Sequence, residues 1–371
     1  MTEIHLNNIG TMLEPTGYAK ANRYLMFELM KLGVHVRFTP HHVEGPKVPL
    51  DPHTEAVMAS LYQNTLANNH IVLFNFPGQY FYRHPHHYTI GLTMFELSGL
   101  PPSWVTKCNE MDEIWVPSVF NQQTFVNSGV DPTKLYVMPL GVDTDYFRPG
   151  IPPLACPKRR SYAFLTVCSF DLRKGIDVLL RAFFEEFSPQ EDVSLIIKTR
   201  ASTDEEIQNQ QAFIDRISNE VTGKKSDSVL LYSSIQSWNE EDMLRLYNTA
   251  DCYVLPTRGE GWSMTVMEAM ATGLPVITTN WSAHVDFVND SNGYLISVEN
   301  LIPCNSVPSL MWAQPSTDHL KQLMRHVYTH PDEAQVKVAN GMDLLRRNYK
   351  WAMCAQTMWR RLQDISRQVN G

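Results

Sequence analysis

The feature that most constrains the fold is a repeated alternation of short apolar runs with runs of helical spacing. The first half of the chain predicts strands and one clear helix, at 70–76, 88–95, 112–118 and 134–140 for the strands and 19–33 for the helix. The second half repeats the pattern, with strands at 162–170, 193–199, 228–235, 252–257 and 275–279 and helices at 175–187, 239–250 and about 263–271. Because strand–helix–strand alternation builds parallel sheets covered on both faces, the sequence predicts an α/β fold.

The proline-rich stretch 139–157 separates the two halves and suits an ordered connector. A chain of 371 residues also exceeds the size of one ordinary core. We therefore expect two doubly wound, Rossmann-like domains, at 1–150 and 151–349. The last helix, at about 350–371, packs either back on the first domain or on the second. Since ligands bind at the carboxyl ends of parallel strands, the two domains would face each other across a cleft that holds the site.

Composition excludes several classes of protein. The net charge is −8, which argues against a nucleic-acid-binding surface. The amino terminus lacks the pattern of a signal peptide, and no apolar run reaches the length of a membrane span. The six cysteines are scattered without a CxxC pair, which predicts free thiols rather than disulfides or zinc. We expect a cytoplasmic protein and leave peripheral contact with a membrane open.

The stretch RGEGWSMTVMEAMATGLPVITT, at 258–279, carries the first candidate site. A strand ends before it and a helix begins near Ser263, so the 262–266 turn offers unpaired N–H groups to a phosphate. Glycines 259 and 261 let the backbone bend and approach a ligand. Glu260 and Glu268 repel phosphate but accept hydrogen bonds from hydroxyl groups. A nucleotide sugar has hydroxyl groups on both sides of a diphosphate and fits this arrangement.

A second candidate phosphate site follows the strand at 162–170. Arg173, Lys174 and Gly175 precede the helix at 175–187, so cations stand beside a helix amino terminus. Either pattern alone is common in α/β proteins. Their occurrence in one predicted domain favours a diphosphate ligand.

These segments together resemble the retaining glycosyltransferases of family 4, which have the GT-B fold and an E-x7-E motif. The resemblance covers nearly the whole chain, through the segments 116–149, 173–183, 259–279 and 284–296 and the terminal tryptophan-bearing helix. It implies that Glu260 contacts the transferred sugar and Glu268 the ribose hydroxyls, and that Lys174 holds the diphosphate. The other donor-binding residues that it implies are Gly17, Arg173, Gly261, Trp262, Ser263, Met264 and Thr265.

Three departures from the family pattern stand out. The arginine that often precedes the lysine is replaced by Ser169 or Phe170 on a shorter turn, and Arg173 is a candidate substitute. The usual EGFG reads EGWS. No histidine stands where many members have one in the first domain, and Glu96 in LTMFELSGLP is our substitute for that catalytic residue. Each of these residues also has a purely structural explanation, as a surface, turn or capping residue.

The resemblance implies a retaining, metal-independent transfer of a hexose from a UDP- or GDP-sugar, by front-face attack and without a cofactor. The acceptor would be a carbohydrate, a lipid-linked molecule or a protein. Alternatives are a catalytically inactive sugar-nucleotide-binding partner of a glycosylation assembly, or an inverting transferase or epimerase of the same fold.

Three motifs suggest other sites and are set aside. The acidic pair in DTD, 143–145, lies in the connector and away from both phosphate turns. The histidines of 83–88 lack a nearby carboxylate or cysteine at metal-ligand spacing. TGKKS, 222–226, lacks the leading glycine and the final Ser or Thr that a P-loop requires.

Overall fold

The computed structural model describes residues 3–41, 47–156 and 159–370 and divides into two compact units. Unit 1 comprises Met1–Gly141 and Asn348–Gly371, and unit 2 comprises Val142–Arg347. The chain first passes from unit 1 to unit 2 between Gly141 and Val142. This is earlier than the boundary at residue 150 that the sequence predicts, because the proline-rich segment is hydrogen-bonded into unit 2. Its Ile151 N–H donates to Asn248 Oδ1 at 3.2 Å, and its Leu154 N–H donates to Thr249 Oγ1 at 2.8 Å. The end of the expected connector, Pro157, lies outside the described residues.

Unit 1 contains a six-stranded parallel sheet in the order β2-β1-β3-β4-β5-β6. Its strands are β1 (His5–Gly10), β2 (His35–Pro40), β3 (Ile71–Asn75), β4 (Thr89–Leu92), β5 (Glu113–Val116) and β6 (Leu135–Val137). The sequence predicts β3 to β6 but misses β1 and β2. Two asparagines interrupt the apolar pattern of β1, HLNNIG, although Asn8 is fully buried. Hydrophobic patterning alone therefore does not predict β1, although it is an inner strand of the sheet.

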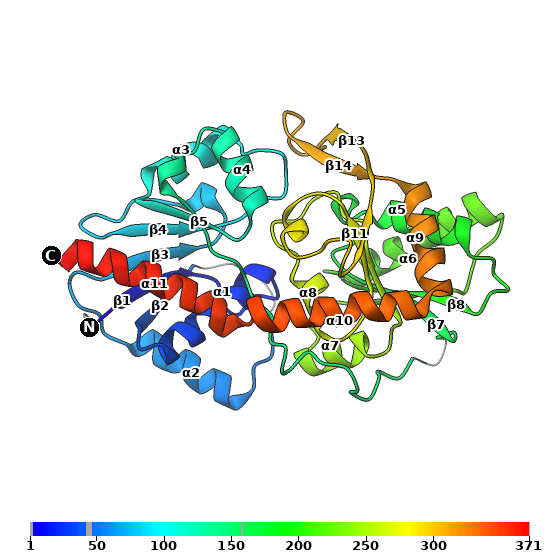
Figure 1. The fold of residues 1–371 in the computed structure, drawn as a ribbon, viewed down its shortest axis with the longest axis horizontal. Coiled ribbons are helices and arrows are strands. Elements are labelled where there is room, and N and C mark those ends of the chain that lie inside the picture. Colours follow the sequence, from blue (N-terminus) through cyan, green and yellow to red (C-terminus); the bar gives the residue numbers. More distant parts are fainter. Residues whose placement is uncertain (1–2, 42–46, 157–158, 371) are drawn as a thin grey trace. The chain divides into compact units, whose positions relative to one another are not determined.

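Helices cover both faces of the unit 1 sheet (Figure 1). They are α1 (Gly17–Lys31), α2 (Pro52–Gln63), α3 (Pro102–Glu110), α4 (Val119–Asn127) and α11 (Trp351–Asn370), with short 3-10 turns η1 (Gly78–Tyr80) and η2 (Pro132–Lys134).

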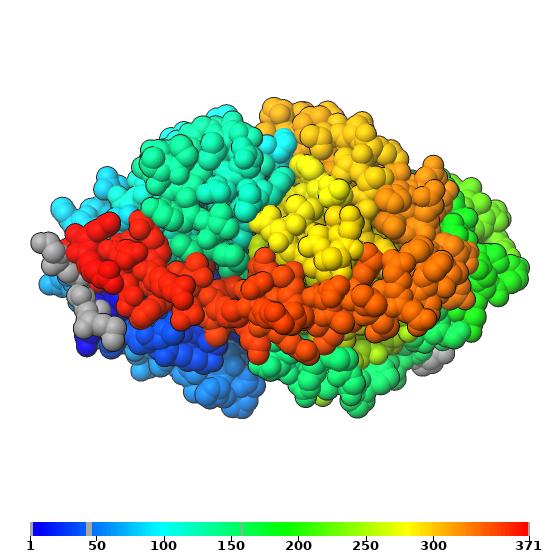
Figure 2. Space-filling view, in the orientation of Figure 1, coloured from blue at the N-terminus to red at the C-terminus, as the bar shows by residue number. Residues whose placement is uncertain are grey.

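The terminal helix α11 lies on unit 1 and contacts α1. In the space-filling view it is the red segment lying over the blue, first part of the unit (Figure 2). The Trp351 ring stacks on Tyr24 at 5.3 Å between centroids, and Arg361 pairs with the buried Glu113 at 2.5 Å. The stacked aromatic pair and the buried ion pair hold α11 on unit 1 rather than on unit 2, the other position that the sequence allowed.

Unit 2 contains a second six-stranded parallel sheet in the order β12-β11-β10-β7-β8-β9. Its strands are β7 (Tyr162–Val167), β8 (Val193–Arg200), β9 (Val229–Ser234), β10 (Cys252–Leu255), β11 (Val276–Thr279) and β12 (Tyr294–Ile296). A two-stranded antiparallel hairpin of β13 (Val298–Pro303) and β14 (Met311–Pro315) follows β12. The sequence predicts the first five strands, but neither β12 nor the hairpin.

The unit 2 sheet also carries helices on its faces (Figure 1). They are α5 (Ile176–Glu186), α6 (Asp204–Thr222), α7 (Glu240–Tyr247), α8 (Met264–Ala271), α9 (Thr317–Thr329) and α10 (Pro331–Asn348), with the short turns η3 (Leu172–Lys174) and η4 (Ala283–Asp286). Among the described residues, no helix is both long enough and apolar enough to cross a membrane. All six cysteines are free thiols.

Candidate functional site

The candidate site lies where the order of strands in unit 2 reverses. From β7 the chain continues outward to β8 and β9, and from the neighbouring β10 it continues in the opposite direction to β11 and β12. The segments leaving β7 and β10 at their carboxyl ends therefore diverge, which is where doubly wound sheets bind ligands. These segments are 168–175 and 256–263, the two turns that the sequence singles out.

The first turn is η3, which carries Lys174. Asp171 caps it by accepting from the Lys174 N–H at 3.0 Å. Gly175 ends it in the left-handed region, with φ +70°, and a Cβ at this position would lie 1.9 Å from the Pro256 carbonyl oxygen. Glycine thus allows the lysine-bearing turn to lie directly against the segment leaving β10.

The second turn carries Glu260, and the two turns meet through an ion pair. Lys174 Nζ lies 2.6 Å from Glu260 Oε1, and Arg173 Nη1 lies 3.7 Å from the same oxygen. The Glu260 side chain is only 7% exposed. Burial acts to raise the pKa of this carboxyl, but the positive charges of Lys174 and Arg173 outweigh it and hold the pKa below its usual value. Glu260 is therefore a buried carboxylate that stays ionised.

Helix α8 begins directly after this turn with an unusual amino terminus. Ser263, its N-cap, has a left-handed backbone with φ 84° and ψ 68°, and its side chain makes no capping hydrogen bond. The Ser263 hydroxyl is buried without a protein partner. An uncapped helix amino terminus beside an unpaired hydroxyl can donate hydrogen bonds to an anion.

The side chains of two predicted donor-binding residues near the start of α8 make contacts within the protein. The Trp262 side chain is 2% exposed, donates to Met267 Sδ at 3.1 Å and packs on Phe287. Thr265 Oγ1 hydrogen-bonds the Tyr253 hydroxyl at 2.9 Å. The backbone of the Gly261, Trp262 and Met264 segment still lines the turn, but the tryptophan ring is part of the core.

Glu268 lies inside α8 and is 6% exposed. Its Oε2 accepts from the hydroxyl of Tyr247, the last residue of α7, at 2.9 Å. Burial and the neighbouring carboxylate raise the Tyr247 pKa well above its usual value, so the phenol is a hydrogen-bond donor at neutral pH. The two glutamates thus have different partners, a lysine for Glu260 and a phenol for Glu268.

The sequence did not predict two residues that interact with Glu260, Ser282 and His284. The Glu260 N–H donates to Ser282 Oγ at 3.0 Å, and Ser282 has φ 76°, a conformation that side chains other than glycine seldom adopt. The adjacent His284 is fully buried, and burial holds its pKa below the usual value. No motif points to Ser282, although the backbone strain is typical of functional sites.

The two predicted residues of the first domain lie in unit 1. Gly17 is exposed and begins α1 after the N-cap Thr16, on the segment that leaves the carboxyl end of β1. Glu96 is half-buried on the segment after β4, and its charge acts on Tyr18, whose hydroxyl donates to the Met94 carbonyl at 3.0 Å. Both residues therefore follow carboxyl ends of strands in unit 1.

The motifs set aside have local structural roles. Asp143 Oδ1 accepts from the Asp145 and Tyr146 N–H groups at 3.0 and 2.9 Å and so closes a turn. Lys225 pairs with Asp215 at 2.7 Å on α6. His87 Nδ1 hydrogen-bonds the His70 carbonyl at 2.9 Å.

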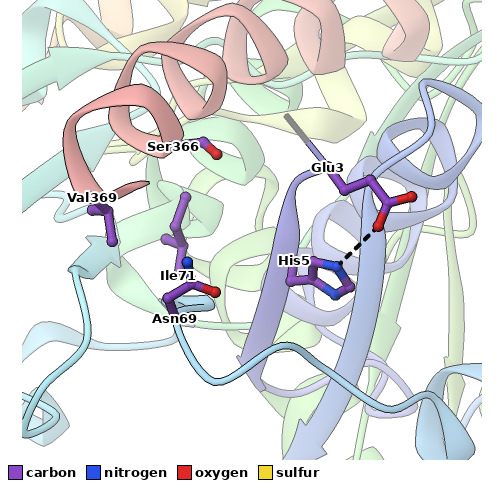
Figure 3. Close-up of a pocket in the computed structure, with 6 residues that line it drawn as sticks. All are labelled: Glu3, His5, Asn69, Ile71, Ser366 and Val369. Atoms are coloured by element: carbon purple, nitrogen blue, oxygen red, sulfur yellow. Dashed lines mark ion pairs between the residues drawn. The ribbon is translucent and has the colours of Figure 1, made fainter. Parts of the chain in front are cut away.

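Within the described residues, one group of side chains has ligand atoms close enough to hold a metal: Glu3, His5 and His35. Two of these residues, Glu3 and His5, also line a small pocket at the amino ends of β1 and β3 (Figure 3). The rings of His5 and His35 are stacked 4.7 Å apart and are within 12° of parallel. Because a metal ion must lie in the plane of each imidazole that binds it, stacked rings cannot share one ion without rotating. Neither this group nor the pocket belongs to the candidate site.

Comparisons with known proteins match the region of unit 2 that contains both turns. The family profile described as "Glycosyl transferases group 1" matches residues 161–303. A D-inositol 3-phosphate glycosyltransferase of Segniliparus rotundus is 27% identical over 156 residues, which is 40% of this chain and 32% of that protein. A UDP-Gal:alpha-D-GlcNAc-diphosphoundecaprenol alpha-1,3-galactosyltransferase of Escherichia coli is 28% identical over 230 residues, 59% of this chain and 53% of that protein. The matched region thus spans between a third and about half of these relatives.

Solved structures resemble the whole chain. The Anabaena protein Alr3699/HepE, in complex with UDP and glucose, superposes with a TM-score of 0.68 at 11% identity, covering 98% of this chain and all of that one. A glycosyltransferase from Rickettsia africae superposes with a TM-score of 0.67 at 14% identity, covering 100% and 99%. At such identities the likeness establishes the fold, and it is the GT-B fold expected from the sequence.

Proposed function

Because the chain belongs to the glycosyl transferases group 1 family, we propose that it transfers a sugar from a nucleotide-sugar donor to a hydroxyl acceptor with retention at the anomeric carbon. The observation that carries this proposal is the buried pair of Lys174 and Glu260, 2.6 Å apart at the point where the strand order of unit 2 reverses. A cation and a carboxylate at that point can bind different parts of one nucleotide sugar. The cation binds its phosphates, and the carboxylate accepts hydrogen bonds from its sugar hydroxyls.

Three groups support a diphosphate position beside η3. Lys174 and Arg173 contribute two positive charges, and α8 contributes its uncapped amino terminus with the unpaired Ser263 hydroxyl. Oxygen atoms of a diphosphate would compete with Glu260 for the Lys174 ammonium when the donor binds. These groups can stabilise part of the negative charge of a diphosphate leaving group, and the proposal needs no metal ion or other cofactor.

The two glutamates have different roles in this proposal. Glu260, released in part from Lys174, accepts hydrogen bonds from hydroxyls of the transferred sugar and stabilises positive charge that develops on the sugar ring. Glu268, with Tyr247 behind it, accepts hydrogen bonds from the ribose hydroxyls. The Tyr247 phenol orients the Glu268 carboxylate, so a change at either residue should act on the nucleotide rather than on the sugar.

In the front-face route, the bond between the anomeric carbon and the diphosphate oxygen breaks as the acceptor oxygen forms its bond on the same face. The acceptor proton passes to the departing phosphate oxygen, so no covalent sugar–enzyme intermediate is required. The chain's own contribution is charge: Lys174 stabilises the departing phosphate, and Glu260 faces the cationic sugar.

The finer assignments rest on the relatives and on chemistry. We assign a UDP- or GDP-hexose as donor, and UDP appears in the names of an Escherichia coli relative and an Anabaena structure. We assign the acceptor, a carbohydrate, lipid-linked molecule or protein, to unit 1, where Gly17 would leave room for the diphosphate and Glu96 would act near the acceptor. The six free thiols suit a reducing compartment such as the cytoplasm.

The test compares Glu260→Gln with Glu268→Gln in the full chain. We first identify the nucleotide by thermal shift with UDP, GDP and ADP, since a bound ligand raises the unfolding temperature by mass action. Glu260→Gln should lower turnover about 10²–10³-fold and leave the affinity for the free nucleoside diphosphate almost unchanged. Glu268→Gln should weaken that affinity by about 10–100-fold, because it weakens charge-assisted hydrogen bonds.

Tyr247→Phe provides the matched control for Glu268, since it removes one hydrogen bond and keeps the carboxylate. It should weaken nucleotide binding by less than Glu268→Gln does. Equal loss of nucleotide affinity in both glutamine variants would contradict the separate roles. Nucleotide binding without turnover on any sugar acceptor would favour an inactive binding partner, and inversion at the anomeric carbon would favour another enzyme class of this fold.

A further inference from the structure

Arg258, two residues before Glu260, is a buried arginine whose five guanidinium N–H groups all have acceptors. The residue is 6% exposed. Its Nη1 and Nη2 donate to the two carboxylate oxygens of Asp177, each at 2.8 Å. Its Nη1 also donates to the Leu172 carbonyl, and its Nε and Nη2 donate to Gln314 Oε1 at 3.2 and 3.1 Å. An arginine has five such donors, so none is left for a ligand.

These acceptors come from three separate segments of unit 2. Leu172 belongs to η3, Asp177 to the first turn of α5, and Gln314 to β14 of the hairpin that follows β12 (Figure 1). The Arg258 backbone repeats the connection, because its N–H donates to the Arg173 carbonyl at 2.6 Å and its carbonyl accepts from the Ala313 N–H at 3.0 Å. Arg258 is therefore the point at which the lysine-bearing turn, the glutamate-bearing turn and the hairpin meet.

The position of Arg258 bears on the distance between Lys174 and Glu260. Lys174 follows directly after the residues that Arg258 holds, and Glu260 lies on the same turn as Arg258 itself. The Arg173 side chain adds a bond across the same gap, from Nη1 to the Gly259 carbonyl at 2.7 Å. The 2.6 Å contact between Lys174 and Glu260 is thus set by how firmly the two turns are joined.

We propose that Arg258 is a positioning residue for the transfer reaction: it fixes the turn of Arg173 and Lys174 against the turn of Glu260, although it touches neither donor nor acceptor. This inference rests on the function proposed above for that pair. A guanidinium is required because it binds Asp177 through two parallel hydrogen bonds while its remaining N–H groups reach Leu172 and Gln314. A lysine keeps the charge but offers one nitrogen, which cannot span the three segments.

The experiment measures kcat and KM for the nucleotide-sugar donor in Arg258→Lys, in the full chain and well below its unfolding temperature. We expect kcat to fall about 10–100-fold, because misplacing reacting groups by about 1 Å has an effect of that order. KM should rise by less than kcat falls, by up to about tenfold, because Lys174 is displaced from the phosphates while the nucleotide keeps its contacts with α8. Gln314→Ala is the milder second variant and should lower kcat in the same direction by a few-fold, because two of the five donors lose their acceptor.

Arg325→Lys is the matched control. Arg325 on α9 also binds two carboxylates, with Nε 2.6 Å from Glu186 and Nη1 2.6 Å from Glu191, but it contacts neither turn of the site. It should lower the unfolding temperature and leave kcat unchanged. If Arg258→Lys behaves in the same way, Arg258 only stabilises the fold and the proposal is wrong.

A double-mutant cycle separates this proposal from the proposed function. If Arg258 positions Lys174, Lys174→Ala should weaken nucleoside-diphosphate binding less in the Arg258→Lys background than in the wild-type background. Additive losses would overturn the positioning role and leave the function standing. A wild-type chain that binds no nucleoside diphosphate and turns over no nucleotide sugar would overturn both.

Discussion

The two units have nearly the same plan but different chemistry at the point where the strand order reverses. In unit 1 that point lies between β1 and β3, and in unit 2 it lies between β7 and β10. In unit 2 it carries charge: Lys174 with Glu260, and Arg258 with Asp177.

In unit 1 the corresponding point carries buried amides, and its buried Arg23 donates to the Met12 carbonyl. Asn22 Nδ2 donates to Asn8 Oδ1 at 2.9 Å and to the Thr11 carbonyl at 3.0 Å, and the Asn75 side chain, at the end of β3, is 1% exposed. Amides direct hydrogen bonds without a fixed charge. The comparison shows that the doubly wound topology provides the place for a site, whereas the residues on the loops decide whether the place suits an anion.

The largest expected effect is a loss of stability when the glycine beside each strand-order reversal, Gly175 in unit 2 or Gly10 in unit 1, is replaced. Gly175→Ala should lower the free energy of unfolding of unit 2 by about 2–5 kcal/mol, because the new Cβ would meet the Pro256 oxygen at 1.9 Å on a backbone with φ +70°. Gly10→Ala should destabilise unit 1 by about 1–3 kcal/mol, since its Cβ would lie 2.6 Å from the Asn75 oxygen. Urea unfolding with hydrogen exchange assigned to each unit measures both losses.

Gly223→Ala separates the two contributions at Gly175. Gly223 has nearly the same backbone angle, φ +73°, but nothing lies within 4 Å of its Cβ position. We expect a loss of about 1–2 kcal/mol there, from the backbone alone. A Gly175→Ala loss no larger than the Gly223→Ala loss would show that the two turns of the site do not lie as close as the structure places them.

The same comparison explains what could be predicted from the sequence. The sequence predicts both turns of the candidate site, since Gly175, Lys174 and the E-x7-E stretch are local patterns next to apolar strands. The contact of Lys174 with Glu260 could not be predicted, because the two residues are 86 positions apart in the sequence. They meet only because β7 pairs with β10. Arg258 lies in the stretch 258–279, but its role requires Gln314, which lies in strand β14 of a hairpin that hydrophobic patterning does not predict.

The second prediction concerns the charge of the unit 2 site. Lys174→Ala should weaken nucleoside-diphosphate binding by about 10–100-fold, because a charge-assisted hydrogen bond contributes about 1.5–3 kcal/mol. Binding of the free nucleoside should change little, since the ammonium reaches only the phosphate position. Calorimetric titration with both ligands gives the two affinities. Lys225→Ala, which removes a lysine paired with Asp215 on α6, is the control and should alter neither. Equal losses for nucleoside and diphosphate would remove Lys174 from the phosphate position.

The smallest effect contrasts two lysines within unit 2. The charge of Lys174 faces the Glu260 carboxylate, whereas Lys198 on β8 donates to the Thr199 carbonyl at 2.7 Å and lies 4.6 Å from the centre of the Trp238 ring. Burial, with a contribution from the charge of Arg200, lowers the pKa of Lys198 to about 8. A buried ammonium with this pKa destabilises the folded state below pH 8, where folded and unfolded chains are both protonated.

As the pH rises from about 8 toward the usual lysine pKa, the folded chain releases this proton before the unfolded chain does, so the wild type becomes more stable. Lys198→Met removes the ammonium and should raise the free energy of unfolding by about 1–2 kcal/mol at pH 7, because the burial penalty exceeds the lost hydrogen bond and ring contact. That advantage should disappear by about pH 10. Urea unfolding at pH 7, 8.5 and 10 measures it, with Lys225→Met as the exposed control. A stability difference between Lys198→Met and the wild type that stays constant across these pH values would contradict this prediction. It would mean that the buried charge of Lys198 does not destabilise the folded state, even though, among the described residues, no carboxylate faces this lysine as Glu260 faces Lys174.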